Sequence, residues 1–247
     1  MIINWHTPLW ITTLCLLVAC SSGTSSSEPS STQELLPSTT SEPLQGTTAS
    51  PSLGQTTAIT PKADLEDVTI IPGEQVGPVT RQTSRTDLGD LFGEAALQDM
   101  QIPVGEGFTE SGTIVNAGTE QAFSIIWVDE SQTQPATIKD FGAAWQTSEG
   151  LKVGTSFTEL QTVLGSFSLY GFGWDYEGTL VLAGSTLDQY DGLLILRLQP
   201  ETAAIEQFPE AYQAVLGDKL LTSNDPNLLR LNLAVNEMIV YLTPPAQ

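Results

Sequence analysis

The chain carries the same sequence pattern at two places, and this duplication limits its possible folds more than any other feature. Residues 83–93 and residues 155–165 both read T-S-x-T-(D/E)-L-x-x-Φ-Φ-G, where Φ is an apolar residue. Further along, residues 104–118 match residues 170–184 through four glycines, a threonine, a valine and an alanine. The two motifs follow in the same order in both copies. Such self-similarity is typical of one structural unit repeated in tandem.

The first motif predicts a short helix in each copy, over residues 84–92 and 156–164. Its serine and threonine residues are preferred helix N-caps, and the acid that follows is favoured by the helix dipole. Leu88 and Leu160 then begin an i, i+3, i+4 apolar stripe, and a glycine ends each helix. We therefore expect Leu88 and Leu160 to be equivalent and buried.

The second motif predicts a turn followed by a strand that starts near Thr113 and near Thr179. Residues 123–128 and 193–198 have strand composition, residues 209–216 suggest a helix, and residues 234–242 suggest a final strand. The predicted fold class is α+β, with two tandem helix-plus-antiparallel-sheet repeats after a disordered linker. The expected segments are a leader at 1–19, a linker at 20–63, a first repeat at 64–138 and a second repeat at 139–247.

Residues 150–165, GLKVGTSFTELQTVLG, resemble the turn-and-helix signature of the small outer-membrane assembly lipoproteins of the SmpA/OmlA type. The β-lactamase-inhibitor protein, a tandem repeat of that fold, is similar. The resemblance implies a helix-on-sheet lipoprotein that acts by binding other proteins. It covers a small part of the chain, and the loops share nothing with the inhibitor, so inhibition is not carried over.

The start of the chain reads as an export signal. Residues 8–19 form an apolar run too short to span a bilayer but suited to a signal peptide. The sequence Leu17-Val18-Ala19-Cys20 resembles the lipobox of bacterial lipoproteins, in which the cysteine thiol is lipidated after cleavage. The resemblance implies an exported protein that is anchored by Cys20 in the cell membrane or the outer membrane. The alternative is an ordinary cleaved signal peptide in which Cys20 has no role.

Residues 21–60 are rich in Ser and Thr, with Pro and Gly among them and few apolar residues. Such a segment buries too little surface to offset the entropy of ordering. We expect it to be a disordered tether between the lipid anchor and the folded part.

Charge and composition exclude several classes of function. The formal net charge is −21, from 29 acidic and 8 basic residues, so nucleic acid is not an expected partner. The single histidine, His6, and both cysteines, Cys15 and Cys20, lie in the first twenty residues. Removal of the leader leaves no histidine for a catalytic triad or a metal site. We expect no catalytic residues, no metal and no cofactor.

The densest group of candidate residues lies at 170–178, where aromatic residues, glycines and two acids alternate. As a ligand or partner surface, this segment would use Tyr170, Phe172, Trp174, Asp175 and Tyr176. As a glycine-rich hairpin, it would place its aromatic rings in the core. The alignment of Phe108 with Trp174 favours the second interpretation, because a shared packing position needs no ligand.

Two functional hypotheses remain open. The first, which we favour, is a membrane-anchored, non-catalytic binding or scaffold module whose partner is an envelope protein or polysaccharide. The alternative is a hydrolase of envelope carbohydrate that uses carboxylates, with Glu106, Glu110, Asp175 and Glu177 as candidates. Such an enzyme needs two acids that face one cleft at about 5–10 Å.

Overall fold

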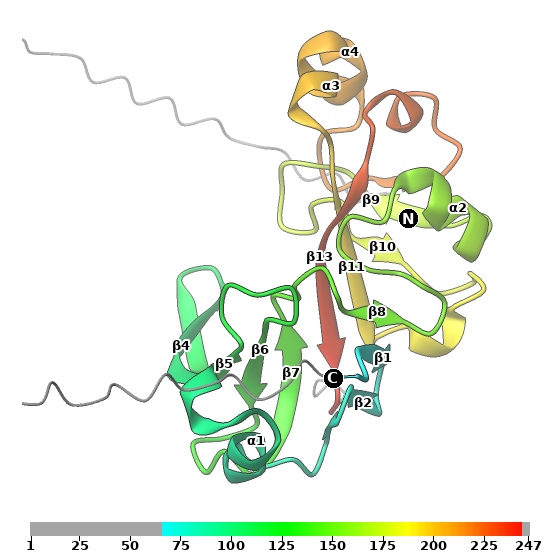
Figure 1. Cartoon of the computed structure of the whole chain (residues 1–247). Helices are drawn as coiled ribbons and strands as arrows, with labels where there is room; N and C mark the ends of the chain where they lie inside the picture. Colours follow the sequence, from blue (N-terminus) through cyan, green and yellow to red (C-terminus); the bar gives the residue numbers. More distant parts are fainter. Residues whose placement is uncertain (1–65, 244–247) are drawn as a thin grey trace, which may run out of the picture. The chain divides into compact units, whose positions relative to one another are not determined.

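The computed structural model describes residues 66–243 (Figure 1), all within one of the two units into which the chain divides, Thr56–Gln247. Helices and antiparallel sheets are mixed along the chain, so the fold class is α+β, as predicted. The leader, the lipobox at Cys20 and the whole linker at 20–63 lie outside the described residues. Within residues 66–243, no helix is both long and apolar enough to cross a membrane.

The largest sheet has six strands in the order β11-β13-β7-β6-β5-β4, and every neighbouring pair is antiparallel. Its strands are β4 (Leu97–Gly105), β5 (Phe108–Val115), β6 (Phe123–Trp127), β7 (Pro135–Lys139), β11 (Leu194–Gln199) and β13 (Ala234–Tyr241). All five side chains of β6 are buried, so both faces of this strand are covered. Within this sheet, β7 pairs with β13 through Ile138 and Val240.

The chain also forms two smaller sheets, of four and of three strands. The first has the order β3-β2-β1-β8, with β1 at Thr69–Ile71, β2 at Gln75–Val76, β3 at Val79–Thr80 and β8 at Gln146–Thr147. The second has the order β10-β9-β12, with β9 at Ser168–Tyr170, β10 at Leu180–Val181 and β12 at Leu220–Thr222. A bridge from Thr179 to Arg197 joins the start of β10 to β11.

The helices are short, and two of them begin with the repeated motif. The α-helices are α1 (Arg85–Phe92), α2 (Phe157–Leu164), α3 (Thr202–Gln207) and α4 (Pro209–Ala214). Three 3₁₀ turns, η1 (Glu94–Ala96), η2 (Asp188–Tyr190) and η3 (Leu228–Arg230), lie between other elements. The helices predicted at 84–92 and 156–164 are therefore present, whereas α3 was not predicted.

Helices α1 and α2 begin in the same way. Ser84 caps α1 and exchanges hydrogen bonds with Asp87, and Ser156 caps α2 and exchanges the same bonds with Glu159. Each pair forms a capping box, which satisfies amide groups that a helix start leaves unpaired. The hydroxyl group of the threonine before each cap accepts a backbone N–H bond of 2.9 Å from the residue three positions earlier.

The first residue of each of these helices also donates a backbone hydrogen bond to the loop before a strand of the large sheet, β7 for α1 and β13 for α2. The backbone N–H of Arg85 donates to the carbonyl of Gln132, in the connection between β6 and β7, at 2.8 Å. The backbone N–H of Phe157 donates to the carbonyl of Leu233, directly before β13, at 2.9 Å. After α1 come the strand pairs β4–β5 and β6–β7, and after α2 come the pairs β9–β10 and β11–β13. The segment from α3 to η3 is inserted between β11 and β13.

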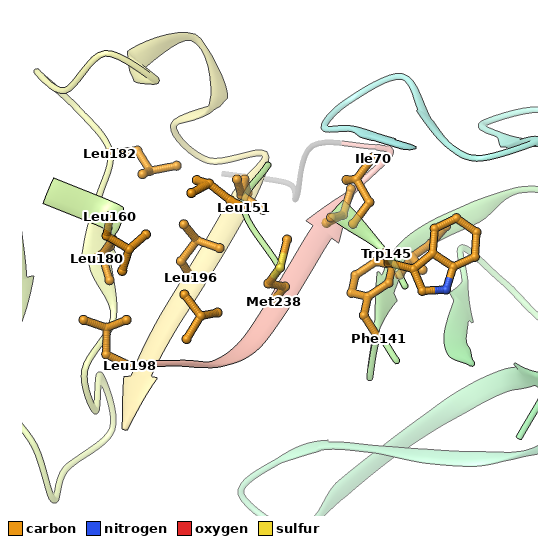
Figure 2. Close-up of a cluster of buried hydrophobic side chains, with 14 of the residues drawn as sticks. Ile70, Phe141, Trp145, Leu151, Leu160, Leu180, Leu182, Leu196, Leu198 and Met238 are labelled. Carbon is orange, nitrogen blue, oxygen red and sulfur yellow. The ribbon is translucent and has the colours of Figure 1, made fainter. Parts of the chain in front are cut away.

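One hydrophobic core joins these elements. Leu88 and Leu160 are both fully buried, as predicted. On the α1 side, Phe92 contacts Phe123, and Phe123 contacts Trp145, in edge-to-face geometry with ring centroids 5.6 and 5.1 Å apart. Figure 2 shows the other side, where the leucines of β11 point toward those of α2 and β10, and Met238 of β13 lies beside them.

Candidate functional site

The segment between β9 and β10 carries the aromatic residues singled out in the sequence, and its backbone is held firmly. The N–H of Phe172 donates to the carbonyl of Val215 at 3.0 Å, and the N–H of Gly217 donates to the carbonyl of Phe172 at 2.9 Å. Gly171 lies so close to the backbone of Val215 and Gly217 that an added Cβ would come within 2.4 Å of their two carbonyl oxygens. Glycine is required at this position because only its backbone can approach so closely.

Phe172 belongs to the core and not to the surface. Its side chain is fully buried and its ring packs near that of Tyr212, so its place among the candidate ligand residues was wrong. The physical reason is the docking of the segment onto the chain after α4, which covers the ring. Tyr170 is half-buried.

Trp174 and Tyr176 lie on the surface. Trp174 is 64% exposed and Tyr176 is 55% exposed, so the interpretation of these two rings as core residues was wrong. Tyr176 stacks on Tyr170, with ring centroids 4.9 Å apart and planes inclined by 28°. Phe108, the residue aligned with Trp174, is 66% exposed. The two residues that align in the sequence are therefore both exposed.

A groove of about 200 Å³ opens beside Trp174. Its walls come from the loop (Trp174, Asp175, Glu177), from β11 (Arg197, Leu198, Gln199) and from β13 (Asn236, Glu237). A neighbouring hollow of about 360 Å³ shares Gln199 and Asn236 and continues toward Glu201 and Asn232. The two hollows therefore form one line of polar side chains beside an exposed indole ring.

Two residues that line the groove, Arg197 and Glu237, belong to a charge cluster. Arg197 and Glu237 are cross-strand partners on β11 and β13, and their side chains form an ion pair of 2.8 Å. Lys139 of β7 approaches the other carboxylate oxygen of Glu237 at 3.5 Å, so two cations share this one acid. Arg197 also donates to the hydroxyl of Thr179 at 3.3 Å. Cross-strand pairing of this kind fixes the positions of the charged groups on the sheet.

Other polar groups of the groove are not used by the protein itself. Within residues 66–243, the side chains of Asp175, Glu177, Gln199 and Asn236 form no hydrogen bond or ion pair, and all four residues are exposed. Carboxylates accept hydrogen bonds, and side-chain amides both donate and accept them. The groove therefore offers hydrogen-bonding groups of both kinds to a ligand.

The four acids considered from the sequence separate into two places. Asp175 and Glu177 line the groove, whereas Glu106 and Glu110 belong to the β4–β5 hairpin, with Glu106 at its turn and Glu110 on β5. The sequence reasoning missed Glu237 as the third acid of the groove. The strand over 234–242 was predicted, but its pairing with β11, which sets Glu237 opposite Arg197, carries no local sequence signal. In the described part of the chain, no group of three metal-binding side chains is present.

Comparison with known proteins gives little beyond these observations. No protein-family model matches the chain. No curated protein matches it either. A solved structure that is similar is the crystal structure of the uncharacterized protein yfeY from Escherichia coli, with a TM-score of 0.40 and 17% sequence identity. The match covers 70% of this chain and 99% of that chain.

Proposed function

We propose that this chain is an exported lipoprotein, anchored through Cys20, whose folded part is a non-catalytic binding module of the cell envelope. The observation that carries the binding role is the exposed Trp174 beside a groove of unused polar groups. An exposed tryptophan costs solvation free energy unless a ligand covers it, and aromatic residues are enriched at binding sites for this reason. The partner is an envelope protein or polysaccharide.

We also propose that the folded part arose by duplication of a unit with one helix and four strands. The matching capping boxes, the matching threonine bonds and the matching ties from each helix start support this proposal. In this arrangement α1 with β4, β5, β6 and β7 corresponds to α2 with β9, β10, β11 and β13. The β7–β13 pair then joins equivalent strands of the two units.

The chemistry of the groove favours binding over catalysis. A general acid must hold a proton at working pH, which proteins achieve by placing the acid in an apolar, desolvated environment. Asp175 and Glu177 are exposed on one loop, and the oxygens of Glu237 face Arg197 and Lys139. None of the three carboxylates has the apolar surroundings that would prepare it for this role.

A hydrolase of envelope carbohydrate is the second candidate, and one observation favours it. The groove brings Asp175, Glu177 and Glu237 to the same place, so more than one carboxylate faces a bound chain. An enzyme of this kind would release new reducing ends from envelope polysaccharide. Asp175→Asn and Glu177→Gln would each abolish that release.

The binding role is tested by capture from solubilised envelope with the detergent-solubilised full chain. We expect the chain to retain envelope material without shortening it, and Trp174→Ala to lose most of that retention. Phe108→Ala, which removes an equally exposed ring elsewhere, should retain it fully. Equal capture by the Trp174→Ala variant would contradict the proposed site, and release of reducing ends would replace the binding role by the hydrolase.

The anchor is tested separately by fractionation. Cys20→Ser should move the protein from the membrane fraction to the soluble fraction or leave it unprocessed, because the lipid attaches to that thiol. Unchanged processing and fractionation would contradict the anchor.

A further inference from the structure

We infer that the groove beside Trp174 binds a neutral, hydroxyl-rich glycan chain. This inference rests on the proposed binding function and names the class of its ligand. Three features of the groove carry it: the exposed aromatic surface, the unused hydrogen-bonding groups and the sign of the charges.

The aromatic surface suits the apolar face of a sugar ring. A pyranose presents a patch of C–H groups that packs against a flat ring, and the indole of Trp174 is 64% exposed beside the groove. The backbone that carries the ring is held in place. The N–H of Glu177 closes a turn onto the carbonyl of Trp174 at 2.9 Å, and a Cβ on Gly178 would clash with the carbonyl oxygen of Leu198 at 2.2 Å. A platform held in this way loses little entropy when a ligand binds.

The polar groups suit sugar hydroxyls. A hydroxyl both donates and accepts, so it pairs well with a side-chain amide next to a carboxylate. Gln199 and Asn236 stand in the wall shared by the two hollows, and neither amide is bonded to the protein in the described part of the chain. The amide of Asn232 is held by Glu201 at the far end of the line. The hydrogen-bonding groups therefore run along a line, as recognition of a chain requires.

The charges exclude an anionic polymer. Asp175 and Glu177 stand at the groove without a partner, and the charge of Arg197 is already paired with Glu237. The whole chain has a net charge of −21, which repels a polyanion at long range as well. A phosphate-rich or carboxylate-rich glycan would therefore meet repulsion, whereas a neutral glycan would not.

The test is calorimetric titration of the detergent-solubilised full chain with a neutral β-linked hexasaccharide of N-acetylglucosamine and, separately, with polygalacturonate, a polyanion. We expect saturable binding of the neutral chain and none of the polyanion. Trp174→Ala and the double variant Gln199→Ala/Asn236→Ala should each weaken binding at least tenfold, because they remove the platform and the shared wall. Phe108→Ala is the matched control and should bind as the unaltered chain does.

Absence of binding to the neutral hexasaccharide, or preference for the polyanion, would overturn the inference. Unweakened binding by Trp174→Ala would also overturn it; thermal unfolding at the unaltered temperature verifies that this variant is folded. Failure of the proposed non-catalytic function would be recognised by a different result: the recovered hexasaccharide would be shorter than the one added. Envelope capture that depends on Trp174 without any glycan binding would contradict this inference alone and leave the binding module in place.

Discussion

The chain segments that begin at α1 and at α2 start alike and end differently. Both helices have the same capping box, the same fully buried leucine and the same tie to a later connection. After α1, β4 and β5 form a long hairpin of nine-residue and eight-residue strands with an exposed tip. After α2, β9 and β10 have only three and two residues, and the loop between them docks on the segment after α4. The helix start is therefore fixed by local chemistry, whereas the groove depends on the segment inserted between β11 and β13.

The variants with the largest expected effect test whether the buried leucines of α1 and α2 contribute equally to the free energy of unfolding. Leu88→Ala and Leu160→Ala should each lower the free energy of unfolding by about 2–5 kcal/mol, because both side chains are fully buried. Urea denaturation measures the change. Leu220→Ala is the control, since that side chain is 58% exposed and its loss should cost much less. A small effect at only one of the two buried leucines would contradict the equivalence of the two helices.

A second pair of variants sharpens the difference between the two segments. The hydroxyl of Thr113 is buried, accepts from the indole N–H of Trp127 at 3.0 Å and donates to Asp99 at 2.6 Å. The hydroxyl of Thr179 is only half-buried and accepts from Arg197. Thr113→Val should therefore cost about 1–3 kcal/mol of unfolding free energy, because it leaves a buried donor unpaired.

Thr179→Val should cost less, because water reaches the Arg197 side chain, which is 39% exposed. Thermal unfolding of the two variants side by side measures the difference. Equal costs would mean that the two threonines have the same role in both segments.

The capping boxes give a smaller and symmetrical effect. Ser84→Ala and Ser156→Ala should each lower the free energy of unfolding by about 0.5–2 kcal/mol, because each removes the side-chain acceptor at a helix start. Serine-to-threonine substitution at the same positions keeps the acceptor and is the control. A loss for Ser84→Ala with no loss for Ser156→Ala would show that the shared motif has diverged in function.

The smallest effect is a dependence on pH. Hydrogen bonds from Ser84 and Ser156 hold the pKa of Asp87 and of Glu159 below their ordinary values, and the bond from Arg85 lowers the pKa of Asp99. A carboxyl with a lowered folded-state pKa stabilises the fold above its unfolded pKa and loses that contribution as the pH falls.

Stability should thus begin to decrease as the pH falls to the ordinary pKa values, 4.5 for Glu159 and 3.8 for the two aspartates, and should continue to decrease until the pH passes their lowered folded-state pKa values. Asp99→Asn should flatten this decrease, and so should Glu159→Gln. Urea midpoints recorded from neutral pH to pH 3 measure the slope. Stability that rises on acidification would contradict these assignments.

Local chemistry explains which elements could be predicted from the sequence. The helices follow from a capping serine, an acid three residues later and a closing glycine, all within eleven residues. The strands at β6, β11 and β13 follow from apolar composition. The short strands β1, β2, β3 and β8 have two or three residues each, too few for any periodicity to appear.

The candidate site could be predicted only in part, because only some of its residues are close together in the sequence. Trp174, Asp175 and Glu177 are neighbours in the sequence, so their loop was recognised as a candidate. Arg197 and Glu237 meet through strand register across forty residues, which no local pattern specifies. The burial of Phe172 and the exposure of Trp174 two positions later depend on how the loop docks on Val215 and Gly217.

We expect the groove beside Trp174, and not the equally exposed ring of Phe108, to contact the envelope. Amide hydrogen exchange of the full chain, free and bound to the envelope fraction that retains it, compares the two regions in one measurement. We predict slower exchange on binding at residues 170–178 and 232–237, with no change at residues 104–110. Protection confined to residues 104–110 would contradict the account, because binding would then lie on the hairpin of the first segment.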